Sequence, residues 1–120
     1  MRQLGKIKCL EVPATTPTDK TLVLFHGFGA DAYDLQTLSD VIKTPWPCNW
    51  IFPQGILEVP IGPGWTGRAW WPIDMAAHQQ AANNNSPLDL SADRPANLDP
   101  LRKMMFDMLK DLRVPWSEII

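Results

Sequence analysis

The chain has 120 residues, a formal net charge of −2, 45% hydrophobic residues and 20% charged residues. This length suits one small domain, 1–120, and the composition is that of a folded globular protein rather than a disordered segment. The balanced charge argues against a nucleic acid or an anionic lipid surface as partner. No stretch approaches the length of a transmembrane segment and no signal sequence is recognisable, so we expect a cytoplasmic protein whose two cysteines, Cys9 and Cys48, stay reduced.

The first half of the chain predicts strands on both sides of a helix. Residues 7–12 alternate weakly and indicate an edge strand, whereas 21–25 form a continuous apolar run typical of a strand covered on both faces. Apolar residues at helical spacing predict a helix near 34–43, with Asp34 as its N-cap. A second buried strand is expected at 49–52, where a proline ends it.

The second half begins with a long irregular connection. Residues 54–97 show no persistent periodicity, and so long a connection is uncommon in a compact domain unless it serves a function. A helix is predicted at 99–112, with Asp99 as N-cap and a proline in the first turn. This order of elements predicts an α/β sheet with right-handed crossovers, in which three buried strands are parallel neighbours: 21–25, 49–52 and 118–120.

Tryptophan is concentrated in one part of the chain. Five of the six tryptophans fall between residues 46 and 71, and the set is Trp46, Trp50, Trp65, Trp70 and Trp71. Tryptophans at this density either fill a core or line a ligand pocket, and the core is the more frequent use.

The stretch LVLFHGFGAD, residues 22–31, is the part of the sequence most suggestive of chemistry. A phosphate-binding loop would need a lysine or a third glycine, and Asp31 would repel a phosphate. A metal site is disfavoured because His26 and His78 are the only histidines and lie far apart, so structural hydrogen bonds are the more common role for His26. The third interpretation is an oxyanion loop, in which the glycines beside Phe28 let its backbone N–H point at a ligand.

Four segments, taken in order, resemble the phospholipase/carboxylesterase family of α/β-hydrolases, which includes bacterial carboxylesterases and acyl-protein thioesterases. They are LVLFHGFGADAYDL, WIFPQG, GRAWWPID and RVPWSEII. The resemblance implies a partial α/β-hydrolase fold, with a mostly parallel sheet and flanking helices but without the C-terminal half. It also implies cleavage of a small acyl ester or thioester through an acyl-enzyme, with no cofactor. The sequence departs from the family pattern at Gly55, where alanine is usual, and at an extra Pro72.

The resemblance also implies roles for individual residues. The Phe28 amide would be the first oxyanion-hole donor, in a loop formed with His26, Gly27 and Gly29. The aromatic residues expected to contact the substrate are Trp65, Trp70 and Trp71.

The catalytic nucleophile expected from the family is missing from these residues. It lies in a G-F-S-Q-G elbow, and none of the four serines is flanked by glycines: Ser39, Ser86, Ser91 and Ser117. His26 is not a substitute for the catalytic histidine, because that residue follows the nucleophile in this fold. We therefore expect the N-terminal part of a hydrolase domain, truncated before the elbow and inactive alone. The alternative is a non-catalytic module that binds itself or a complementary C-terminal fragment.

Overall fold

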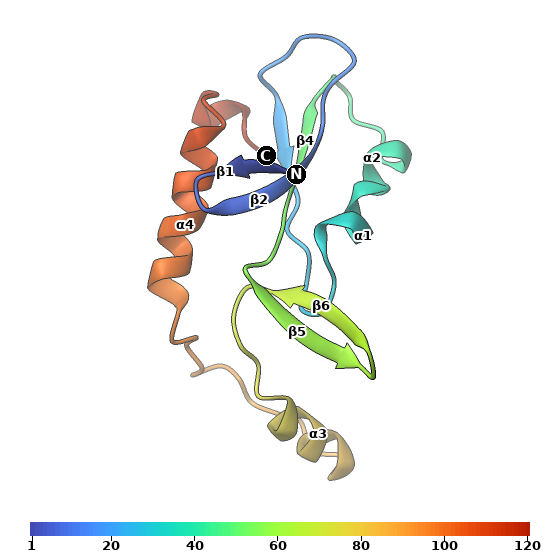
Figure 1. Cartoon of the computed structure of the whole chain (residues 1–120), viewed down its shortest axis with the longest axis vertical. Coiled ribbons are helices and arrows are strands. Elements are labelled where there is room, and N and C mark those ends of the chain that lie inside the picture. Colours follow the sequence, from blue (N-terminus) through green and yellow to red (C-terminus); the bar gives the residue numbers. More distant parts are fainter.

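The computed structural model describes residues 1–120 and contains a four-stranded sheet, a separate two-stranded hairpin and several helices (Figure 1). The strand order in the larger sheet is β1-β2-β4-β3. These strands are β1 (Arg2–Leu4), β2 (Ile7–Val12), β3 (Thr21–Val23) and β4 (Asn49–Pro53). The hairpin consists of β5 (Leu57–Gly62) and β6 (Trp65–Ala69).

The predicted parallel neighbours are confirmed. Strands β3 and β4 run parallel, with Thr21 opposite Asn49. On the other side of β3, Ile119 forms a parallel bridge with Thr21, and the Ile120 N–H donates to the Thr21 carbonyl at 2.8 Å. The expected strand at 118–120 is not formed as a strand: the 3₁₀ helix η1 (Trp116–Glu118) includes its first residue, and Ile119 makes a single isolated bridge.

The prediction of a mostly parallel sheet is wrong for the larger sheet as a whole. Strand β1 pairs with β2 and β2 pairs with β4, both antiparallel, so only the pairing of β3 with its neighbours is parallel. Residues 7–12 are not an edge strand either, because β1 covers that edge. The turn between β1 and β2 uses Gly5 at a φ of 56°, a conformation that favours glycine.

Two predicted helices exist with altered boundaries. The expected helix at 34–43 is divided into α1 (Ala32–Gln36) and α2 (Leu38–Val41). Its N-cap is Asp31 rather than Asp34, and the two carboxylates form a reciprocal capping box. The second expected helix is α4 (Leu98–Asp111), which begins after Asn97, so Asp99 lies in its first turn instead of capping it.

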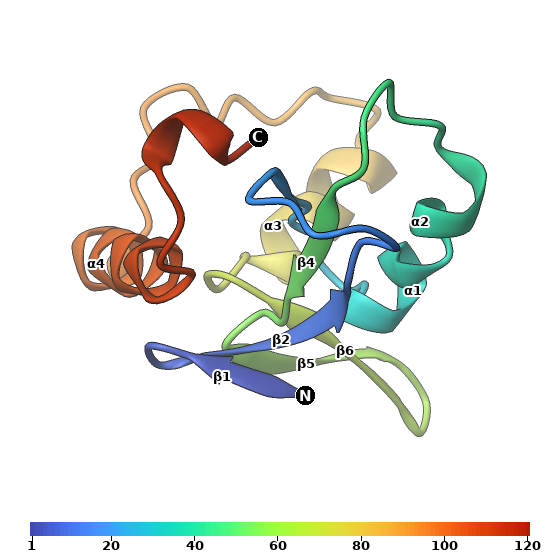
Figure 2. The ribbon, with the colours of Figure 1, turned by 90° about the horizontal axis from the view of Figure 1, so that it is seen from above.

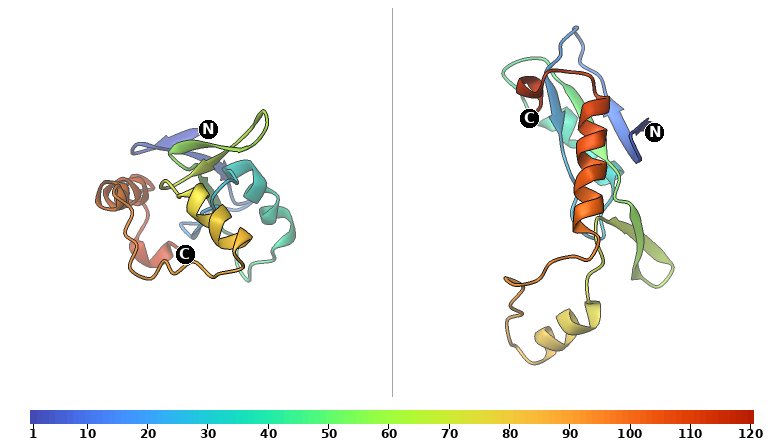
Figure 3. Two further views of the ribbon diagram at one scale, coloured as in Figure 1. Left: turned by 90° about the horizontal axis from the view of Figure 1, so that it is seen from below. Right: turned by 90° about the vertical axis from the view of Figure 1, so that its left-hand side faces the viewer.

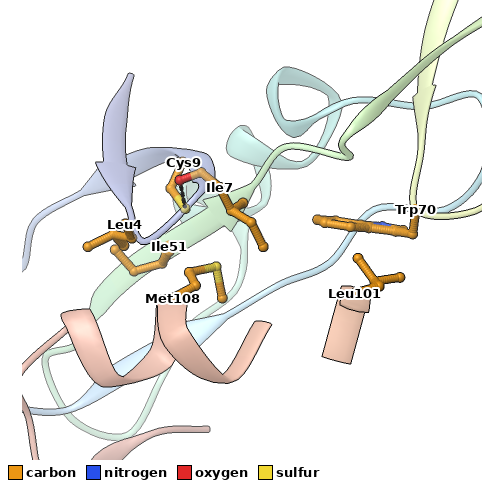
Figure 4. Packing of buried hydrophobic residues seen from close by; sticks show 7 residues of the cluster. All are labelled: Leu4, Ile7, Cys9, Ile51, Trp70, Leu101 and Met108. Atoms are coloured by element: carbon orange, nitrogen blue, oxygen red, sulfur yellow. Dashed lines mark hydrogen bonds between the residues drawn. The ribbon is translucent and has the colours of Figure 1, made fainter. Parts of the chain in front are cut away.

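Helices cover both faces of the larger sheet, as Figure 2 shows for α4 on one side of β4 and α1 on the other. Strand β4 serves both layers, since Ile51 packs toward α4 while Trp50 and Phe52 pack toward α1. The core on the α4 side is drawn in Figure 4 and contains Leu4, Ile7, Cys9, Ile51, Trp70, Leu101 and Met108. Alternation along β4 therefore builds two cores from one strand.

The long connection is more structured than its sequence indicates. It contains the β5–β6 hairpin and a helix, α3 (Met75–Asn83), which lies at the end of the molecule beyond the hairpin (Figures 1 and 3). No residue between 74 and 96 is buried. None of the helices combines the length and apolar character needed to span a bilayer.

Candidate functional site

The glycine loop lies at the carboxyl end of β3 and pairs with strand β6. The Gly29 N–H donates to the Arg68 carbonyl and the Arg68 N–H donates to the Ala30 carbonyl, each at 2.9 Å. Gly29 has a φ of 83°. A Cβ on Gly67 would collide with the Gly29 carbonyl, so the loop and the hairpin can approach this closely only with glycine at position 67.

His26 is buried, with 3% of its surface exposed, and both ring nitrogens have backbone partners. Nδ1 lies 2.7 Å from the Gly27 carbonyl oxygen, and Nε2 accepts a hydrogen bond from the Gly55 N–H at 2.9 Å. The His26 carbonyl accepts the indole N–H of Trp70 at 2.9 Å, and the two rings lie 5.3 Å apart. These contacts are the structural hydrogen bonds that are the more common role for such a histidine.

Two further residues, which the sequence analysis did not single out, connect the loop to the exit of β4. The Gln54 side-chain carbonyl accepts the Ala32 N–H at 2.8 Å, at the start of α1. The Arg68 Nε donates to the Gly55 carbonyl at 2.9 Å. The contact of Gln54 could have been suspected from the sequence, because a polar glutamine directly follows a buried strand. Nothing in the sequence near Arg68 indicated its contact with Gly55. We call residues 26–30, 54–55 and 67–70 together the loop junction.

The backbone N–H groups of the loop fall into two sets. The Gly29 and Ala30 N–H groups donate to backbone carbonyls, whereas the N–H groups of His26, Gly27 and Phe28 have no hydrogen-bond partner in the chain. The Phe28 residue lines a hollow of about 230 Å³ against β5 and the segment after β6. Its other lining residues, most of them apolar, are Leu57, Glu58, Val59, Pro60, Pro72, Ile73 and Met75.

The three tryptophans expected to contact substrate occupy different environments. Trp70 belongs to the core, where Figure 4 shows its ring over Leu101. Trp71 is 40% exposed and Trp65, near the tip of the hairpin, is 72% exposed. None of the three lines the hollow beside Phe28. Their assignment to the substrate stays a prediction.

No nucleophile with a partnered base is present in the described chain. The Ser39 hydroxyl donates to the Gln36 carbonyl at 2.8 Å within the α1–α2 turn, and neither histidine ring bonds a serine hydroxyl. Burial raises the pKa of the Cys9 thiol to about 12, so it is not a ready thiolate. No three histidine, cysteine or carboxylate side chains lie close enough together to hold a metal ion.

The architecture places a glycine loop and an apolar hollow at the carboxyl end of a parallel strand, which is where α/β proteins bind ligands. A family model described as phospholipase/carboxylesterase matches residues 8–92, well over half of the chain. The chain belongs to the phospholipase/carboxylesterase family, and three of the four resembling segments lie within the matched residues. No solved structure gives a significant match.

Proposed function

We propose that this chain supplies the oxyanion loop and part of the substrate-binding wall of a hydrolase that cleaves carboxylic ester or thioester bonds through an acyl-enzyme. The observation that carries the proposal is the unpaired N–H of Phe28, the one residue of the loop that also lines the apolar hollow. In this proposal the free amide, in the loop that follows β3, binds the substrate carbonyl oxygen.

The physical role of the amide is electrostatic. When a nucleophile adds to an ester carbonyl, negative charge accumulates on the oxygen, and a donor already aimed at that position lowers the barrier by roughly 3–4 kcal/mol. The two backbone bonds between the loop and β6 support a fixed rather than an adaptable donor, since Gly29 and Ala30 are both held by Arg68. A fixed donor needs no reorganisation when the charge develops.

The hollow beside Phe28 supports an apolar acyl group as the part of the substrate nearest the amide. Its walls include Leu57 and Val59 from β5, and Ile73 and Met75 from the segment that follows β6. Apolar walls around a few polar groups are the usual lining of a small-molecule site. Trp65 and Trp71 do not line this hollow, so in this proposal their exposed rings contact the substrate outside it, whereas Trp70 contributes from the core, where its indole N–H binds the His26 carbonyl.

The nucleophile, acid and histidine of the reaction are assigned by the proposal to residues outside these 120. The ground for this is that none of the four serines has glycine neighbours or a histidine partner. No cofactor is required, because an acyl-enzyme route needs only a nucleophile, a base and oxyanion donors.

A titration followed by NMR tests the proposal on the 120-residue chain. The probe is octyl methylphosphonate, a tetrahedral monoanion that resembles the reaction intermediate and carries an apolar chain. We expect a saturable downfield shift of the Phe28 amide proton, with little change at Gly29, whose N–H is already paired with Arg68. The matched variants are Phe28→Pro, which removes the amide proton, and Phe28→Leu, which keeps it. A response spread evenly over both amides, or no response at Phe28, overturns the proposal.

A second candidate, an assembly module without catalysis, is favoured by the absence of a serine–histidine pair. It predicts that the chain self-associates in sedimentation experiments and that the phosphonate leaves Phe28 unchanged. The same titration therefore separates the two candidates.

A further inference from the structure

We propose that His26 is a positioning residue for the Phe28 amide, and that it acts as the neutral imidazole protonated on Nδ1. Its functional meaning rests on the proposed oxyanion role of Phe28. The inference comes from the two ring contacts of His26, which reach different parts of the chain: Gly27 in the loop itself and Gly55 beyond β4.

The two partners select one form of the ring. The Gly55 N–H is only a donor, so Nε2 has to carry the lone pair that accepts it. The Gly27 carbonyl is only an acceptor, so Nδ1 has to carry the proton that is donated to it. The single neutral tautomer that satisfies both contacts has its proton on Nδ1.

The contact to Gly27 controls the direction of the Phe28 N–H. The Gly27 carbonyl and the Phe28 N–H belong to the same peptide unit, which is planar and trans, so the two groups point in opposite directions. Holding the carbonyl therefore holds the N–H. The His26 ring at 2.7 Å and the Ala30 N–H at 3.3 Å both contact that carbonyl oxygen. Bonds accepted by the carbonyl also polarise the peptide and make its N–H a better donor.

The ring is itself held firmly enough to serve as an anchor. The side chain is buried against Trp70, whose indole N–H binds the His26 carbonyl at 2.9 Å. Its partner Gly55 is packed so closely on β6 that an added Cβ would lie 2.8 Å from the Ala69 carbonyl oxygen. The Arg68 Nε holds the Gly55 carbonyl as well. The contacts of the loop junction therefore fix the Gly27–Phe28 peptide relative to β4 and β6.

The first experiment uses the unmodified chain with ¹⁵N-labelled histidine and backbone. We expect the His26 ring to be protonated on Nδ1 and unprotonated on Nε2, with a scalar coupling across the hydrogen bond between Gly55 N and His26 Nε2. A proton on Nε2, or the absence of that coupling, overturns the proposal without any variant having to fold.

The second experiment compares two amide variants of His26. In His26→Asn the side-chain amide nitrogen replaces Nδ1 and keeps the donor to Gly27, whereas in His26→Gln the side-chain oxygen replaces Nε2 and keeps only the acceptor for Gly55. We expect the Phe28 amide to keep a rigid order parameter of about 0.85 in His26→Asn and to fall below about 0.6 in His26→Gln. His78→Gln, with the other histidine changed, is the control. Equal order at Phe28 in the two His26 variants overturns the proposal.

The phosphonate titration then separates this proposal from the one on which it rests. His26→Gln should weaken phosphonate binding at Phe28 about fivefold, the equivalent of one net hydrogen bond, and His26→Asn by less than about twofold. Equal phosphonate affinities of the two His26 variants would overturn the positioning role. If the unmodified chain shows no response at Phe28, the oxyanion role fails, while the tautomer and order measurements still decide whether His26 positions the peptide.

Discussion

The loop junction and the α3 segment, residues 74–96, are held in opposite ways. In the junction, the decisive bonds join residues far apart in the chain, as His26 joins Gly55 and Gly29 joins Arg68. In the α3 segment the bonds are local: Asp74 caps Ala77, and Gln79 pairs with Asn83. The segment buries no residue. The comparison shows that a region can be regular in structure without being supported by packing.

The largest effect expected from this comparison is the loss of a core side chain that supports the junction. Leu101 is 1% exposed and lies beneath Trp70, so Leu101→Ala should lower the free energy of unfolding by about 3 kcal/mol. The matched change in the α3 segment, Met75→Ala, removes a side chain that is 56% exposed and should cost less than about 0.5 kcal/mol. Urea denaturation measures both, and equal losses would contradict the contrast.

The next effect is overpacking between the loop and the hairpin. Gly67→Ala should cost about 2 kcal/mol, because the new methyl group forces the Gly29 carbonyl away and weakens the pairing with Arg68. Gly62→Ala in the same hairpin is the control, since its nearest contact, the Trp65 Cβ at 3.9 Å, is ordinary van der Waals packing. Denaturation curves for both variants, with amide exchange at Gly29, test the difference. Similar stabilities would show that the close approach is not needed.

The free energy of unfolding should depend on pH because of the buried Cys9 thiol in β2. Burial raises the pKa of the Cys9 thiol from 9.0 to about 12, so the folded chain keeps the thiol neutral at pH values where the unfolded chain ionises. The resulting stability is complete below pH 9 and should be lost between pH 9 and pH 12, at about 1 kcal/mol per pH unit. The measurement is the difference in unfolding free energy between the unmodified chain and Cys9→Ala across this range. A difference that stays constant with pH would contradict it.

Removing helix caps should sharpen the comparison further. Asp31→Ala breaks the capping box of α1, whose Ala32 is buried, and should lower global stability by about 1 kcal/mol. Asp74→Ala removes the corresponding bond from α3, but this helix has no buried residue. We expect it to melt locally, with faster amide exchange at 75–83 and an unchanged denaturation midpoint. A shifted midpoint for Asp74→Ala would show that α3 is coupled to the core.

The last prediction is that the 120-residue chain shows no esterase activity and no covalent labelling. Neither region provides an activated serine, so a fluorophosphonate probe should label none of the four serines, and a short p-nitrophenyl ester should hydrolyse at the background rate. Mass spectrometry after labelling is the readout, with a known serine esterase as positive control. Stoichiometric labelling of Ser86 or Ser91, in the α3 segment, would reveal a nucleophile that the proposal excludes.

The sequence by itself determined the elements whose signals are local. Apolar runs predicted β3 and β4 as parallel neighbours, helical spacing predicted α4, and the glycines after β3 indicated the loop that belongs to the recognised family. These features follow from the burial pattern of consecutive residues, which sequence periodicity reports directly.

Only the tertiary structure decided which distant groups meet. Strand β1 escaped prediction because three residues carry too little pattern, and the β5–β6 hairpin escaped it because Pro60, Gly62 and Gly67 interrupt the alternation of its strands. The roles of His26 and Trp70 were open for a different reason. The hydrogen-bond partners of the His26 ring and the core position of the Trp70 indole exist only once β4, β6 and α4 have packed together. Hydrogen bonds across 29 or 44 residues are set by chain packing, which no local pattern encodes.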